Sequence, residues 1–296
     1  MNVGKKKISE RLFDCFNILF MLLLALICVY PLYYVVCASF SEPKYLMSHL
    51  GALILPQGFT LKGYELVFKN PNIISGYRNT IIYLVVGTTI NIFMTSLGAF
   101  VLSRKNAMLV RPLMIMVVIT MYFSGGLIPS YLLVQKLHLY NTIWAMVIPG
   151  AISTYNMIVM RTAFMSIPSS LEESARIDGA SEFTVLFKII LPLSKATIAT
   201  MVLFYGVAHW NSWFSASIYL DDNSKFPLQL ILRQILIQND TQSMVNAGSV
   251  GTSSVSIYQS LIKYCTIVVG TVPILCIYPF LQKYFAKGVM VGSLKE

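Results

Sequence analysis

The chain has 296 residues, of which 56% are hydrophobic and 11% are charged, and its mean hydropathy is +0.69. This composition excludes a soluble domain, in which about 25% of the residues are charged. The net charge of +10 fits a nucleic-acid-binding protein, but Lys and Arg are scattered at the ends of apolar segments and form no basic stripe. We therefore expect an all-α, polytopic membrane protein that contacts lipid and binds no nucleic acid.

Six apolar segments follow one another along the chain, each long enough to cross a bilayer. An unpaired backbone N–H or C=O group is costly in hydrocarbon, so each segment should be helical. The first segment is longer than the apolar part of a signal peptide and has no Ala-x-Ala site after it, so we expect it to remain as the first span. The expected spans are residues 12–40, 77–102, 109–134, 140–161, 196–220 and 261–284.

The positive charges predict how these spans are oriented. If the N-terminus is cytoplasmic, the inner side receives 14 of the 22 Lys and Arg residues, and the other eight lie mostly in two long outer loops. Both termini should therefore be cytoplasmic. The inner set is Lys5, Lys6, Lys7, Arg11, Arg104, Lys105, Arg111, Arg161, Arg176, Lys188, Lys195, Lys283, Lys287 and Lys295.

The inner connection between the fourth and fifth spans, residues 162–195, is too long for a hairpin and carries four of the twelve acids. Pro168 is followed by two overlapping S-x-x-E patterns, Ser169 with Glu172 and Ser170 with Glu173, which are typical of a helix N-terminus. This first helix should run through Ile177.

A turn and a second helix should follow. Asp178 and Gly179 form a pair that tolerates positive φ, and Ser181 can cap the next helix. Leu191 and Pro192 should end that helix before the fifth span.

The first helix of this loop has two possible roles. Small residues at Ser174 and Ala175, with acids at Glu173 and Asp178, would let another polypeptide approach closely and would offer it charges at the rim. The alternative is an amphipathic helix at the lipid headgroups, but such helices are usually basic on the polar face, and this one is acidic. The acidic face favours a protein-docking surface.

The pattern E-S-A-x-x-D-G-A, followed by F-x-x-I-L-P, resembles the EAA loop of binding-protein-dependent ABC importer permeases. Ser174 stands where alanine is usual in that motif. The likeness extends over most of the chain and is greatest to the carbohydrate, maltose-type branch and within it to the LplC or YtcP type. The motif residues are Glu173, Ser174, Ala175, Asp178, Gly179, Ala180, Phe187, Ile190, Leu191 and Pro192.

This resemblance implies a type I ABC importer permease fold, with residues 1–296 as one transmembrane domain in a bacterial cytoplasmic membrane. It also implies a second permease, an ABC ATPase dimer and an extracytoplasmic sugar-binding protein as partners. The loop at 162–195 would couple the ATPase to the spans, and ATP and Mg²⁺ would be bound by the ATPase. The solute would be a carbohydrate, an oligosaccharide.

Several expected absences agree with a role that is not enzymatic. The sequence has no G-x-x-x-x-G-K-[ST] phosphate loop, no HExxH and no G-x-S-x-G pattern, so we expect no catalytic residues, no metal site and no cofactor in this chain. An ion-coupled secondary transporter is the main alternative, but the spans hold almost no acids that could bind the coupling ion. A second alternative is an ABC permease for a solute that is not a sugar.

Aromatic rings and amide groups could line a path for sugar, because a pyranose ring stacks on aromatic faces and its hydroxyls need hydrogen-bonding partners. Alternatively, these side chains form the aromatic belt at the membrane surface or bond neighbouring helices. The polar outer stretch 246–252 could reach the binding protein or be a plain connector. The path candidates are Tyr122, Phe123, Tyr155, Asn156, Tyr205, His209, Trp210, Asn211 and Trp213.

Overall fold

The computed structural model describes residues 8–48, 51–104, 109–237 and 255–293, which form helices and no β-strand. The chain divides into two compact units, one made of residues 1–70 and 235–271 and the other of residues 71–234 and 272–296. The orientation prediction rests partly on Lys5, Lys6, Lys7, Lys105 and Lys295, and these lie outside the described residues. So does the outer stretch 246–252.

The first unit contains α1 (Ile8–Ser39), α2 (Pro43–Ser48), α3 (Lys62–Lys69) and the first part of α16 (Val255–Ser293). The helices meet where α1 ends. The Ser39 hydroxyl bonds the Tyr64 hydroxyl at 2.7 Å, and the Cys265 thiol contacts the Ser39 carbonyl at 3.4 Å. Gly63 is needed at this contact, because a Cβ there would lie 2.5 Å from the Cys265 sulfur.

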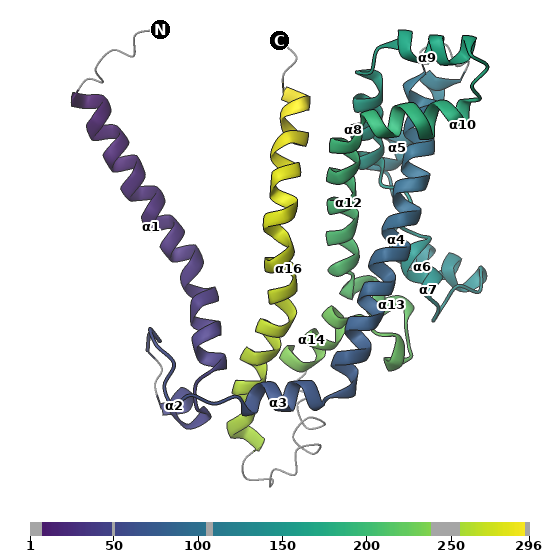
Figure 1. Cartoon of the computed structure of the whole chain (residues 1–296). Helices are drawn as coiled ribbons and strands as arrows, with labels where there is room; N and C mark the ends of the chain where they lie inside the picture. Colours follow the sequence, from purple (N-terminus) through teal and green to yellow (C-terminus); the bar gives the residue numbers. More distant parts are fainter. Residues whose placement is uncertain (1–7, 49–50, 105–108, 238–254, 294–296) are drawn as a thin grey trace. The chain divides into compact units, whose positions relative to one another are not determined.

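The second unit is arranged around α4, a helix of 33 residues (Figure 1). The helices α8 and α12 pack along α4, α9 and α10 lie near its C-terminal end, and η2 contacts its N-terminal part. The elements are α4 (Pro71–Ser103), α5 (Val110–Tyr122), α6 (Leu127–Lys136), α7 (Ile143–Val147), α8 (Thr154–Met165), α9 (Ser169–Ile177), α10 (Glu182–Val185), η1 (Leu186–Ile190), α11 (Leu191–Leu193), α12 (Lys195–Trp210), α13 (Trp213–Tyr219), η2 (Asn223–Lys225), the first part of α14 (Leu228–Ile237) and the end of α16.

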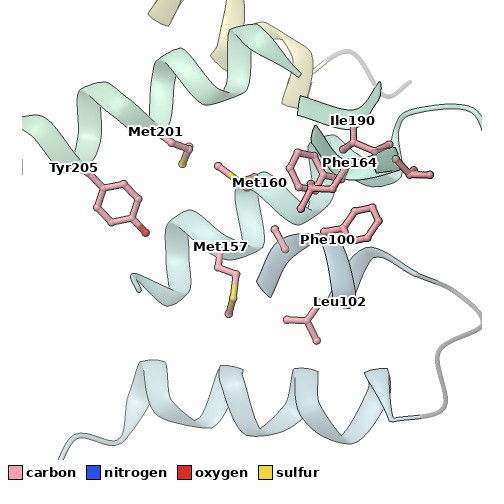
Figure 2. Close-up of a cluster of buried hydrophobic side chains, with 11 residues drawn as sticks. Phe100, Leu102, Met157, Met160, Phe164, Ile190, Met201 and Tyr205 are labelled. Atoms are coloured by element: carbon pink, nitrogen blue, oxygen red, sulfur yellow. The ribbon is translucent and has the colours of Figure 1, made fainter. Parts of the chain in front are cut away.

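Apolar side chains from five elements form the core of the second unit (Figure 2). Phe100 from α4, Phe164 from α8, Val185 from α10, Ile190 from η1 and Met201 from α12 are all buried in it. The loop between the fourth and fifth spans therefore contributes to the same core as the spans. This shared core makes the loop part of the folded unit.

The long apolar helices that the sequence predicts are present, but only some of the six expected spans are continuous helices. Among the described residues, three helices are long and apolar enough to cross a membrane, and up to five cross if each of two bent pairs counts as one. The first, second and sixth expected spans are the single helices α1, α4 and α16.

The prediction of unbroken helices is wrong for the third, fourth and fifth spans. The third divides into α5 and α6 with a bend of 112°, at a break that contains Gly126 with φ +89°. The fourth divides into α7 and α8 around Pro149, which has no N–H for a helical hydrogen bond. The fifth divides into α12 and α13 after Trp210.

Candidate functional site

The first helix of the loop, α9, starts directly after Pro168 and ends at Ile177, as predicted. Its predicted capping box is wrong, because Pro168 occupies the cap position and no side chain caps the helix. Glu172 is instead the buried residue of α9 and pairs with Arg104. The ion pair therefore takes the carboxylate that the capping box would have used.

The turn after α9 has the geometry that the sequence predicts. Gly179 has φ +80°, its N–H donates to the Arg176 carbonyl at 3.0 Å, and the Ala180 N–H donates to the Ala175 carbonyl at 2.9 Å. These two bonds make a Schellman motif, which requires the left-handed conformation that glycine adopts without strain. The turn ends α9 and leads into α10.

The second helix of the loop begins at the predicted cap, because the Ser181 hydroxyl accepts the Thr184 N–H at 3.3 Å. The helix continues past the predicted end at Leu191 and Pro192, through the wide turn η1 and α11 to Leu193, and then bends by 86° into α12. Pro192 has no N–H to bond the carbonyl four residues earlier, and the wider η1 turn comes just before it.

The motif residues divide between solvent and core. Ile190 is fully buried in the core, and Ala175, Ala180 and Leu191 pack against it. The exposed members are Glu173, Ser174, Asp178, Gly179, Phe187 and Pro192. Phe187 stacks on Phe93 of α4, with the ring centroids 6.4 Å apart. The exposed members on α9 and in the turn after it form the outer face of a helical elbow made of α9, the Gly179 turn and α10.

Two ion pairs hold the elbow, and the sequence reasoning missed both. Arg104, the residue after α4, pairs with Glu172 through Nη1 and Oε2, and Arg176 pairs with Glu182 at 2.8 Å. Burial lowers the pKa of the Arg104 guanidinium, and the nearby Glu182 carboxylate opposes that shift. Arginine nevertheless stays charged at neutral pH. In the sequence, Glu172 is marked only by the S-x-x-E spacing, and Arg104 only by its place among the positive charges expected on the inner side.

The residues expected to line a sugar path differ in how far they are exposed. Tyr122, Phe123 and Tyr155 are exposed, with 76% of the first two accessible. Asn156, Tyr205, His209 and Trp210 are buried. The Asn211 amide donates to the Val207 carbonyl of the preceding helix turn. The Arg233 guanidinium lies over the Trp213 ring, with its central carbon 3.7 Å from the ring centroid.

Two of the buried candidates belong to a polar cluster that joins α4, α12 and the break before α8. The Asn91 amide donates to the carbonyls of Gly150 and Ala151 at 2.6 and 2.9 Å, and its oxygen lies 2.7 Å from His209 Nε2. These bonds give partners to carbonyl groups that the broken fourth span leaves free.

Tyr205 completes the cluster, because its hydroxyl bonds Thr95 at 2.7 Å and accepts the Ser153 N–H at 3.1 Å. His209 and Tyr205 thus hold the break before α8. In the described part of the chain, no group of three or more His, Cys, Asp or Glu side chains is placed to hold a metal ion.

Gly87 is required beside this cluster, and its substitution by alanine is a direct test. A Cβ at Gly87 would lie 2.4 Å from His209 Cε1 and Nε2, so the ring must leave Asn91. Gly87→Ala should lower the free energy of unfolding by about 1–3 kcal/mol, measured by denaturant titration in detergent. Gly206→Ala is the matched control, since its Cβ would meet only the Thr88 hydroxyl at 4.0 Å. Equal stability of the two variants would contradict this packing.

The apolar helices of membrane-spanning length define an α-helical membrane protein. Residues 73–291 match the family described as the binding-protein-dependent transport system inner membrane component. The match covers more than half of the chain, so the chain belongs to this family of transporter permeases.

Individual relatives cover nearly the whole chain. The polygalacturonan/rhamnogalacturonan transport system permease protein YtcP of Bacillus subtilis (strain 168) is 43% identical over 287 residues, which are 97% of this chain and 99% of that protein. Protein LplC of the same organism is 41% identical, covering 97% of this chain and 96% of its own.

A solved structure supports the fold. A chain from the crystal structure of a bacterial ABC transporter involved in the import of the acidic polysaccharide alginate is 28% identical and superposes with a TM-score of 0.87. The likeness covers 96% of this chain and 100% of that chain. The fold is thus that of an ABC importer permease, and the resemblance to the LplC and YtcP type is confirmed.

Proposed function

We propose that this chain is a membrane-spanning subunit of an ATP-driven importer and translocates an oligosaccharide delivered by an extracytoplasmic solute-binding protein. The observation that carries this proposal is the elbow formed by α9, the Gly179 turn and α10, in a chain of the permease family. The names of YtcP and of the alginate transporter both refer to polysaccharides that contain uronic acids. Acidic oligosaccharides are therefore the first candidates.

The partners follow from the same proposal. The chain pairs with a second permease, and an ABC ATPase dimer binds the exposed face of the elbow and hydrolyses ATP with Mg²⁺. The permease itself then needs no catalytic residue. Glu173 and Asp178 support this role, because both acids are exposed on the elbow while α9 itself is anchored to the core.

In this proposal residues 1–296 form one transmembrane domain with six spans, and both termini and the loop 162–195 lie on the cytoplasmic side. The pair α7 and α8 supplies the span that length alone does not reveal. The breaks in the third and fourth spans then lie beside the solute path, because irregular backbone at membrane depth is tolerated where it lines a water-filled cavity or is covered by protein. Tyr122, Phe123 and Tyr155 support this, since all three are exposed next to those breaks.

The remaining path candidates have a different role in this proposal. Tyr205 and His209 position the path wall through their buried hydrogen bonds, and Asn156 and Trp210 pack behind it. Asn211 and Trp213 lie at the break between α12 and α13.

The decisive experiment is uptake into proteoliposomes that hold this chain with its partner permease and ATPase. Radiolabelled oligogalacturonate, alginate oligomer, arabino-oligosaccharide and maltotriose are supplied in turn with the solute-binding protein. We expect uptake that needs internal ATP and is unaffected when ion gradients are dissipated. Uptake driven by an ion gradient without ATP identifies a secondary transporter instead, and ATP-driven uptake of none of the sugars identifies an ABC permease for another solute.

A further inference from the structure

Two adjacent glutamates on α9 have different environments. Glu172 is 8% exposed and is the buried residue of the helix, whereas Glu173 is exposed. The apolar residues of α9 give it little other anchorage, because Leu171 is 45% exposed and Ile177 is 87% exposed. Ala175 is the member of α9 that packs against the core.

Arg104, the partner of Glu172, is held firmly at the end of α4. Its Nε donates to the Phe100 carbonyl at 3.3 Å, and its guanidinium lies over the Phe100 ring, 4.1 Å from the centroid. A second arginine, Arg161 of α8, donates to the Leu102 carbonyl at 2.7 Å. Both bonds satisfy carbonyls that the end of α4 leaves without helical partners. These contacts fix the Arg104 side chain to the C-terminal end of α4, so the two must move together.

A cavity of about 320 Å³ lies beside the ion pair. Its walls include Arg104, Glu172, Phe164 and Ile167. On this side α9 is not closely packed against the end of α8, so a displacement of α9 cannot pass there through side chains in contact. Among the described residues, two side-chain connections from α9 to the spans are the Arg104–Glu172 pair and the small Ala175 contact.

An ion pair is suited to carry such a displacement. The two side chains are only 17% and 10% exposed, so separating them would leave each charge in a poorly solvated site. When α9 moves, the two charged groups should therefore stay in contact, whereas the weaker apolar contacts can change. A displacement of α9 in either direction would then move the end of α4.

We propose that the Arg104–Glu172 pair is the joint through which movement of α9 is passed to α4 when the transporter hydrolyses ATP. Arg104 and Glu172 are positioning residues in this scheme, since neither touches ATP or solute. Glu173 is exposed and Glu172 is paired with Arg104, so in this scheme the two neighbouring acids divide the coupling between an outer and an inner contact. This inference rests on the proposed function.

The test uses the complete transporter in proteoliposomes and the panel sugar with the highest uptake. Three quantities are measured for each variant: the assembled complex per vesicle, the rate of ATP hydrolysis and the solute carried per ATP. We expect Glu172→Gln and Arg104→Gln to assemble normally and hydrolyse ATP, while the solute carried per ATP falls about tenfold. The control is Glu65→Gln, which breaks the exposed Lys69–Glu65 pair of α3, outside the elbow, and should change nothing.

A variant with both substitutions shows whether Arg104 and Glu172 act as one unit or independently. If the residues act as one unit, Arg104→Gln with Glu172→Gln should lose no more transport per ATP than either single change. Glu172→Asp keeps the charge but shortens the side chain, so it should assemble even if Glu172→Gln does not, and it should still carry less solute per ATP.

Two results would overturn the joint. One is uptake that falls only in proportion to the assembled complex, with solute per ATP unchanged in all variants, including Glu172→Asp. The other is a double variant whose loss of solute carried per ATP, expressed as a free energy, equals the sum of the losses in the two single variants. Failure of the proposed function is seen separately, because the unmodified transporter would then show no ATP-driven uptake.

Discussion

Gly179→Pro should abolish ATP-driven uptake while leaving the protein inserted in the membrane. Gly179 has φ +80°, whereas proline holds φ near −65°, so the Schellman turn between α9 and α10 cannot form. The substitution also removes the N–H that bonds the Arg176 carbonyl at 3.0 Å. The spans do not depend on this turn for their apolar faces. The measurement is uptake per assembled complex, together with the amount of the variant in the membrane fraction.

Two milder substitutions show whether backbone conformation is the cause. A Cβ at Gly179 meets nothing within 4 Å, so Gly179→Ala tests the positive φ alone, at a cost of about 1–2 kcal/mol. Gly179→Asn should be tolerated better than alanine, because asparagine adopts this conformation more readily. We expect uptake to fall in the order Gly, Asn, Ala, Pro. Normal uptake by the proline variant would contradict the assignment of the elbow as the coupling site.

Asn91→Leu should destabilise the second unit more than any other single change in its polar cluster. The Asn91 side chain bonds Gly150, Ala151 and His209, and leucine of similar size can make none of these bonds. Each buried polar group left without a partner costs about 1–3 kcal/mol, so the free energy of unfolding should fall by about 2–5 kcal/mol. Denaturant titration in detergent measures it. ATP-driven uptake should fall with it, because the break before α8 is no longer held.

Thr89→Val is the matched control for Asn91→Leu. Thr89 lies two residues earlier on α4, is exposed, and its hydroxyl bonds only the Val85 carbonyl of the same helix. Its loss should change the free energy of unfolding by no more than about 0.5 kcal/mol. If both substitutions had the same effect, the buried hydrogen bonds of Asn91 would not be what holds the broken span.

The accuracy of the sequence predictions follows the range of the interactions involved. The turn at Gly179 and the cap at Ser181 depend on bonds within a few residues, and the structure confirms both. The capping box before Glu172 is just as local, yet it does not form. There a partner 68 positions earlier in the chain, Arg104, takes the carboxylate, and no local pattern reveals such a partner.

The span predictions show the same limit. Hydropathy located the six expected spans, but it missed the shorter apolar helix α14 and did not predict that three of the spans are broken. A break in a span is tolerable only if the freed backbone groups find partners, and the Asn91 amide that serves Gly150 is 59 residues away. Periodicity also cannot tell whether Tyr205 and His209 face a sugar path or a neighbouring helix. Their hydrogen bonds join them to Thr95, Ser153 and Asn91 within the protein.

The sequence by itself determined that the chain is a helical membrane protein, the family it resembles, and the position of the acidic elbow. The first rests on composition and hydrophobic segment length, the second on resemblance to the E-S-A-x-x-D-G-A motif and the third on turn chemistry, all of which can be read locally in the sequence. Only the tertiary structure decided which glutamate faces inward, where the spans break and which polar side chains are occupied. Each of these depends on groups that are distant in the chain and become neighbours only when the helices pack, because a buried polar group must find its partner wherever the fold brings one.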